Sequence, residues 1–252
     1  MDITLKTYLI VCPLVFLAGL VDSIGGGGGL ISLPAYMFAG LPAHNAVATN
    51  KLSSSMGTAI ATGRLSYHNR PKWYHAIPAI ILALIGSQLG ARLSLLIPDN
   101  AFKIILCVIL PVVAFYVLKE KSLDKASQVE IPLSKQIIIL CASSFIVGAY
   151  DGFYGPGTGT FLILIYTGWA HMTLMESAVT TKLANLTSNI SSLVVFLMSG
   201  LVHIKLGLIA GLFSILGNYI GAGLVLKNGS RIVRAIILVV ISILFVKIII
   251  EL

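Results

Sequence analysis

The sequence predicts an all-α polytopic membrane protein made of two inverted-topology repeats with glycine-broken helices, with about eight to ten membrane segments. The first observation behind this prediction is composition. Of the 252 residues, 57% are hydrophobic and only 10% are charged, whereas a soluble domain carries about 25% charged residues. The second is the length of the uncharged stretches, and the third is a glycine-rich break that occurs twice.

Four uncharged stretches approach or exceed the roughly 20 residues that a helix needs to cross the hydrocarbon. No Asp, Glu, Lys or Arg lies between Asp22 and Lys51, Lys72 and Arg92, Lys182 and Lys205, or Lys205 and Lys227. Apolar segments are predicted, in chain order, at 7–24, 30–40, 43–63, 73–96, 101–118, 135–153, 159–168, 171–200, 204–226 and 231–250. The segments 30–40 and 159–168 each follow a glycine break and are too short to cross upright, so we expect half-helices.

Internal similarity divides the chain into a first repeat at 1–118, a linker at 119–134 and a second repeat at 135–252. Three anchors recur at offsets of 129, 131 and 131 residues: 19–22 with 148–151, 49–52 with 180–183, and 86–91 with 217–222. The halves are not chemically identical, because Glu176 occupies the position of Asn45. Two backbone breaks at matching positions are the best sequence indication of a transporter binding site.

Loop charges indicate the orientation of the repeats. The linker and the loops at 64–72 and 227–234 are rich in Lys and Arg, whereas those at 92–103 and 200–205 are poor. Basic loops face the cytoplasm, so the linker is predicted to be cytoplasmic and both termini to lie outside. The loop at 227–234 is equivalent to 92–103, and 64–72 to 200–205. Equivalent loops therefore prefer opposite sides, which is typical of inverted repeats.

Several function classes find no support in the sequence. The net charge of +8 does not indicate a nucleic-acid partner, because most basic residues lie in predicted membrane loops. The glycine runs lack the P-loop pattern and a strand context, so a nucleotide site is excluded. Cys12, Cys107 and Cys141 have no CxxC spacing, so neither a disulfide framework nor a metal site is expected. No cofactor is expected either.

Lys51 and Lys182 are the strongest candidates for function. A charge deep in a membrane segment costs roughly 2.5–3.5 kcal/mol on insertion scales, and is a functional-site hypothesis by default. One interpretation is a symmetric pair of cations around a central anion, and the other is structural ion pairing with Asp22 and Asp151. These two interpretations are compatible. The aspartates themselves are candidate proton carriers, or they cap freed backbone N–H groups near a helix end.

The groups around the lysines are candidate hydrogen-bond donors to the same anion. Glycines expose backbone N–H groups and bring helix N-termini to one point, where the helix dipole favours negative charge. Other Ser, Thr and Asn residues in membrane helices more often serve helix packing, so only those adjacent to the lysines are selected. The predicted contacts are Thr49, Asn50, Thr180, Thr181, Gly26, Gly27, Gly28, Gly157 and Gly159.

Two motifs resemble those of the sulfite exporter TauE/SafE family, also called the toluene sulfonate uptake permease superfamily. The first comprises 22–29, Pro34 and 45–51, and the second comprises 152–160 followed by 180–182. The resemblance covers nearly the whole chain. It implies a prokaryotic inner-membrane permease for small sulfur-containing anions, such as sulfite or organosulfonates.

The expected function is therefore secondary transport of a small anion by alternating access between the halves. Its expected partners are the anionic substrate, the lipid bilayer and coupling protons, with a homo-oligomer left open. An anion-selective channel is the first alternative. An intramembrane enzyme is the second, although the sequence offers no nucleophile–base pair or metal cluster for it.

Overall fold

The structure is a computed structural model that describes residues 3–98, 101, 131–228, 231–233 and 236. Nearly all of the predicted segments 101–118 and 231–250 and of the linker, together with Cys107, lie outside the described residues. Cys12 and Cys141 are free thiols.

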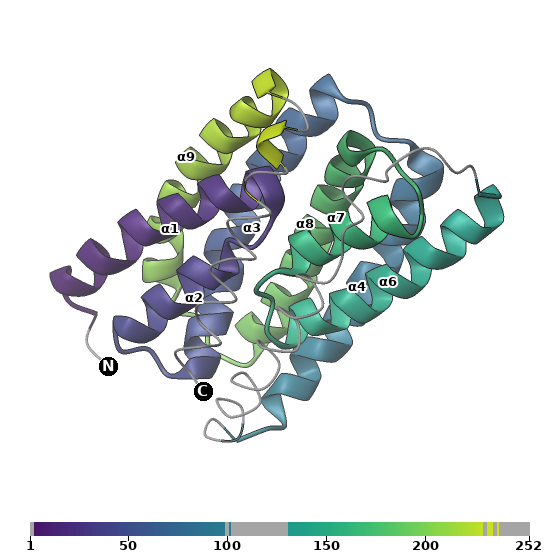
Figure 1. The fold of residues 1–252 in the computed structure, drawn as a ribbon. Helices are drawn as coiled ribbons and strands as arrows, with labels where there is room; N and C mark the ends of the chain where they lie inside the picture. The colour runs from purple at the N-terminus through teal and green to yellow at the C-terminus, as the bar shows by residue number, and fades with distance from the viewer. Residues whose placement is uncertain (1–2, 99–100, 102–130, 229–230, 234–235, 237–252) are drawn as a thin grey trace, which may run out of the picture.

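The described part of the chain is all-helical, as predicted (Figure 1). Its eight labelled helices are α1 Leu5–Gly25, α2 Gly29–Phe38, α3 Ala43–His68, α4 Trp73–Leu95, α6 Leu133–Phe153, α7 Thr158–Gly168, α8 Leu174–Met198 and α9 Ile204–Asn228. Four of these, α1, α4, α6 and α9, are long and apolar enough to cross a membrane. The polytopic fold class is thereby confirmed.

The two short helices were correctly predicted. Helices α2 and α7 have 10 and 11 residues. They follow the glycine breaks and closely match the predicted segments 30–40 and 159–168. The third helix was predicted too short, because α3 continues from residue 63 to His68. Arg64, predicted to lie in a loop, is therefore helical. Its guanidinium donates to the Tyr219 backbone carbonyl at 2.6 Å and lies over the Tyr219 side-chain ring.

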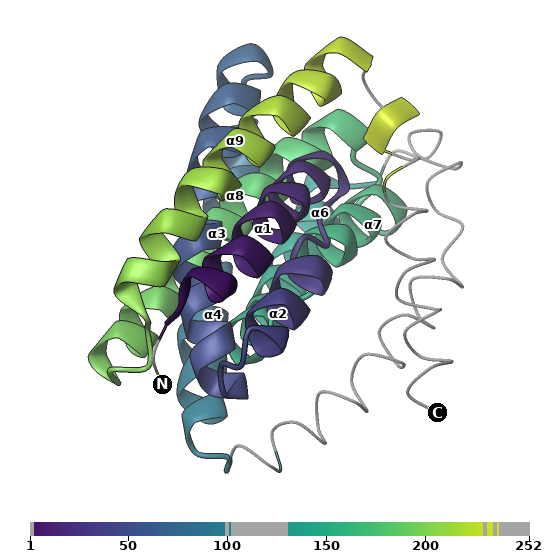
Figure 2. The same ribbon diagram turned by 90° about the vertical axis from the view of Figure 1, so that its left-hand side faces the viewer.

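Equivalent helices of the two halves pack in equivalent pairs. In the first half α1 packs on α9 of the second, and in the second half α6 packs on α4 of the first (Figure 1). The central helices repeat the scheme, since α3 packs on α9, α8 on α4, and α3 on α8. Figure 2 shows the face made by α1, α2 and α9. The halves are thus interleaved, while their inverted orientation across a membrane stays a prediction.

Glycines bring the paired helices close together. A Cβ on Gly90 would strike the Ala149 carbonyl of α6, and one on the equivalent Gly221 would strike Ser23 of α1. Small residues allow such close backbone approach between membrane helices. These positions therefore have a packing role.

The two glycine breaks meet each other at the centre of the molecule. A Cβ on Gly26 would lie 2.7 Å from the Gly159 Cα, and one on Gly159 would lie 2.9 Å from the Gly26 Cα. Thr160 ties the breaks together by donating to the Gly25 carbonyl at 2.9 Å. Gly26 also has φ +78° and ψ −178°, a conformation open essentially to glycine alone.

We predict that Gly26→Ala lowers stability strongly. The backbone conformation alone costs about 1–3 kcal/mol for a residue with a Cβ, and the clash with the second break adds to this. Gly63→Ala is the matched control, because nothing lies within 4 Å of its added Cβ and alanine is favoured in a helix by roughly 0.5–1 kcal/mol. Thermal unfolding of the purified variants in detergent gives the comparison. Equal melting temperatures for the two variants would contradict the central contact.

Candidate functional site

A polar cavity lies where the two breaks meet the central helices. It is lined from both halves by Val15, Ala18, Gly19, Asp22, Gly27, Gly28, Gly29, Ser32, Asn50, Lys51, Ser54, Thr58, Asp151, Gly155, Gly157, Thr158, Gly159, Asn185, Asn189, Ser214 and Asn218. Buried clusters of polar groups in a membrane bundle usually mark substrate or ion pathways. This cavity is therefore the candidate site.

Lys51 is the cation of the cavity. Its Nζ donates to Asp151 Oδ2 at 2.7 Å and to Asn189 Oδ1 at 3.1 Å. The two charged side chains are only 2% and 3% exposed. An ammonium carries three N–H donors, so these two bonds leave one for another ligand.

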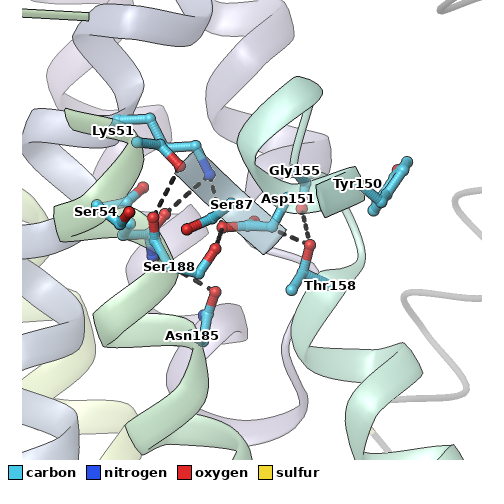
Figure 3. A network of polar contacts seen from close by, with 12 residues as sticks. Lys51, Ser54, Ser87, Tyr150, Asp151, Gly155, Thr158, Asn185 and Ser188 are labelled. Atoms are coloured by element: carbon cyan, nitrogen blue, oxygen red, sulfur yellow. Dashed lines mark hydrogen bonds and ion pairs between the residues drawn. The ribbon is translucent and has the colours of Figure 1, made fainter. Parts of the chain in front are cut away.

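Asp151 is held on several sides by donors. Besides Lys51, it accepts from the Thr158 hydroxyl at 2.9 Å on Oδ1 and from the Ser188 hydroxyl on Oδ2. Figure 3 shows Lys51, Ser188 and Thr158 converging on this carboxylate from three helices. These contacts satisfy the Asp151 carboxylate and hold it in place.

The second ion pair is built differently. Lys182 Nζ donates to Asp22 Oδ2 at 2.9 Å and also to the Asp22 backbone carbonyl. Here the carboxylate side chain is 18% exposed, and Asp22 lines the cavity whereas Lys182 does not. Each lysine therefore pairs with the aspartate of the other half, and the ion-pair interpretation describes this structure.

The remaining predicted contacts fall into separate places. Asn50, Gly27, Gly28, Gly157 and Gly159 line the cavity. The others do not. Gly26 lies at the contact between the breaks, Thr49 accepts from the His203 N–H at 3.1 Å, Thr180 lines a separate pocket, and the Thr181 hydroxyl is buried without a hydrogen-bond partner among the described residues.

Two helix N-termini face the cavity. Gly28 and Gly157 are the N-cap residues of α2 and α7, and both line it together with the first residues of those helices. Several of the first N–H groups of α2 and α7 already donate to carbonyls just before these helices, and the helix dipole gives each N-terminal end a partial positive charge. The cavity thus combines one lysine and two positive helix ends with the carboxylates of Asp22 and Asp151.

Sequence reasoning missed several lining residues. Because the selection stopped next to the lysines, it left out side chains one or two helical turns further along α3 and α8. It also left out the polar side chains of α9, because Ser and Asn residues in membrane helices more often serve helix packing. The missed residues are Ser54, Thr58, Asn185, Asn189, Ser214 and Asn218. A spacing of three to four residues from each lysine was the available signal for Ser54 and Asn185.

Comparison with known proteins agrees with this architecture. Residues 11–248 match the family described as Sulfite exporter TauE/SafE. The chain belongs to the sulfite exporter TauE/SafE family. It is a multi-pass membrane protein of a family of membrane transporters.

Curated relatives of this TauE/SafE family member match it over most of their length. A "Probable membrane transporter protein ORF9" of Sinorhizobium sp is 32% identical, covering 89% of this chain and 85% of that protein. A "Probable membrane transporter protein" of Haemophilus influenzae is 32% identical over 95% and 93%, and YfcA of Escherichia coli is 32% identical over 92% and 85%. No solved structure matches the chain.

In this TauE/SafE family member we predict unequal costs for equivalent substitutions. Asp151→Asn leaves Lys51 charged, buried and without its counter-ion, which costs about 3–5 kcal/mol in comparable buried pairs. Asp22→Asn should cost less, because Lys182, although as buried as Lys51, keeps its bond to the Asp22 backbone carbonyl, and because Asp22 is more exposed than Asp151. Melting temperatures of both variants in the same detergent check this. An equal or larger fall in melting temperature for Asp22→Asn would contradict the prediction that the Lys51–Asp151 pair is the costlier one to break.

Proposed function

We propose that this protein is a secondary transporter for a small anion, a sulfur oxoanion or an organosulfonate such as sulfite, in the inner (plasma) membrane. The observation that carries the proposal is the meeting of Lys51 with the N-termini of α2 and α7 in one cavity. The positive dipole end of a helix N-terminus suits an oxoanion. Asn50 and Asn185, which also line the cavity, add amide donors.

The balance of buried charge supports coupling to protons. Lys51, Lys182, Asp22 and Asp151 form two ion pairs and sum to zero charge. A singly charged anion that enters leaves one negative charge in excess in a region of low dielectric, which is costly. Protonation of one aspartate restores neutrality. Asp22 is the better carrier, because its side chain is 18% exposed against 3% for Asp151 and accepts from one side-chain donor where Asp151 accepts from three.

Alternating access fits the interleaved packing. Each half contributes a half-helix and one member of each ion pair, so the cavity lies between the halves. Movement of one half against the other would expose the anion to either side in turn, as in other repeat-built transporters.

The direct test is anion flux into proteoliposomes, with sulfite, thiosulfate, organosulfonates and carboxylates compared. Lys51→Gln should reduce saturable flux by at least roughly tenfold, since a charge-assisted bond to the anion is worth about 1.5–3 kcal/mol. Lys205→Gln removes the same charge from an exposed position outside the cavity and should transport normally. Unchanged flux in folded Lys51→Gln protein would remove Lys51 from the site. Large single-channel currents would favour the channel alternative.

Proton coupling predicts a separate phenotype. A pH gradient should accelerate anion flux through the native protein, and Asp22→Asn should abolish that acceleration while anion exchange without a gradient continues. Asparagine at this position imitates the protonated, neutral carboxyl. Flux at a series of gradients, with the internal pH clamped, measures the effect. Full acceleration in Asp22→Asn would exclude Asp22 as the proton carrier.

A further inference from the structure

Two surface pockets occupy equivalent positions in the two halves. One is lined by residues 69–72, just before α4, and by Met175, Glu176, Val179 and Thr180 of α8. The other lies at the start of α3, the end of α4 and the loop before α9, and is lined by Pro42, His44, Asn45, Leu95, Ile97 and Leu201. The offset of 131 residues relates Asn45 to Glu176 and Thr49 to Thr180. We call them the Glu176 mouth and the Asn45 mouth.

The Asn45 mouth is closed by neutral hydrogen bonds to backbone. Asn45 Nδ2 donates to the Leu201 carbonyl at 2.9 Å, and Thr49 accepts from the His203 N–H at 3.1 Å. Opening this mouth would leave backbone groups without partners. Each such hydrogen bond contributes about 0.5–1.5 kcal/mol.

The Glu176 mouth is closed by a solvent-facing ion pair instead. Lys72 Nζ lies 2.5 Å from Glu176 Oε1, and the side chains are 48% and 29% exposed. The hydrogen bond to Glu176 raises the pKa of Lys72, so this lysine stays charged. Exposed pairs of this kind contribute only about 0–1 kcal/mol.

The carboxylate of Glu176 also has a second partner, which it keeps when Lys72 moves away. Glu176 is the third residue of α8, and its Oε2 accepts from the Thr173 N–H at 3.3 Å in a capping box. Lys72 can therefore exchange Glu176 for another anion while the helix cap remains. Arg70, which is exposed, lines the same pocket and supplies a second positive charge.

We propose that the Glu176 mouth is an anion-docking site at which an oxoanion displaces Glu176 from Lys72. This inference rests on the proposed function and names the pocket at which its anion is first captured. Arg70 and Lys72 attract the anion, Thr180 lines the pocket although it is only 2% exposed, and Glu176 is the internal competitor. Along α8, Thr180 and Asn185 are separated by an axial rise of about 7.5 Å at 1.5 Å per residue, so the pocket lies within two helical turns of a residue that lines the central cavity.

The test uses thiol labelling, which does not depend on transport. Thr180→Cys protein in detergent is treated with two methanethiosulfonate reagents, one with a sulfonate tail and one with a quaternary ammonium tail. Each rate is normalised to the reaction of a free thiol. We expect the sulfonate reagent to be favoured by roughly fivefold, since an exposed charge contributes about that factor. The preference should rise in Glu176→Gln and disappear in Lys72→Gln combined with Arg70→Gln.

Two further variants keep the test decisive. Met175→Cys probes the same pocket if Thr180→Cys does not fold. Its matched control is His44→Cys, because His44 is equivalent to Met175 and lines the Asn45 mouth. The unmodified chain gives the background from Cys12, Cys107 and Cys141. Equal preference at the two mouths, or a preference indifferent to Lys72 and Glu176, would overturn the docking site. Correct labelling without anion flux would instead overturn the proposed function.

Discussion

The contact between the two glycine breaks is the constraint on which the rest of the structure depends. Gly26 and Gly159 touch backbone to backbone, where a single Cβ on either has no room. Because the chain reverses here without a side chain, α2 and α7 begin at the same point and turn their N-termini to one cavity. Irregular backbone at membrane depth survives only where protein covers it or it lines a cavity. Here each break covers the other, and together they form the cavity wall.

The crossed ion pairs follow from this arrangement. Since the breaks meet, Asp22 and Asp151, which lie in the last turns of α1 and α6, are near the central helices of the opposite half. Lys182 and Lys51 approach from those helices and neutralise them. A buried pair gains little over an apolar pair of the same shape, but a buried charge without a partner is very costly. The pairs thus hold the halves in one register, and they create a site whose charge balance an incoming anion must disturb.

Much of this was predictable, and the omissions have physical reasons. Composition and uncharged stretches predict the helices, and the glycine runs predict α2 and α7, because both are properties of single segments. The repeat predicts two lysines and two aspartates but not their pairing across halves, since alignment relates Asp22 to Asp151 and leaves their partners open. Asn189 and Asn218 could not be selected, because in a sequence a polar residue that faces a cavity has the same appearance as one that packs between helices. The helical extension of α3 to His68 was hidden by the charge of Arg64, which lies over Tyr219.

Divergence between the halves matters most where the scaffold is most symmetric. A duplicated bundle with two equivalent mouths tends toward two conformations of similar free energy, and differences of a few kcal/mol then decide which one is populated. The two central ion pairs differ in burial and in the number of donors, and the two mouths differ in whether ions or backbone groups close them. Breaking an exposed ion pair costs about 0–1 kcal/mol, and a part-buried hydrogen bond to backbone contributes about 0.5–1.5 kcal/mol. The exchange of Asn45 for Glu176 in an otherwise repeated frame therefore replaces a neutral hydrogen bond with an ion pair at the equivalent position.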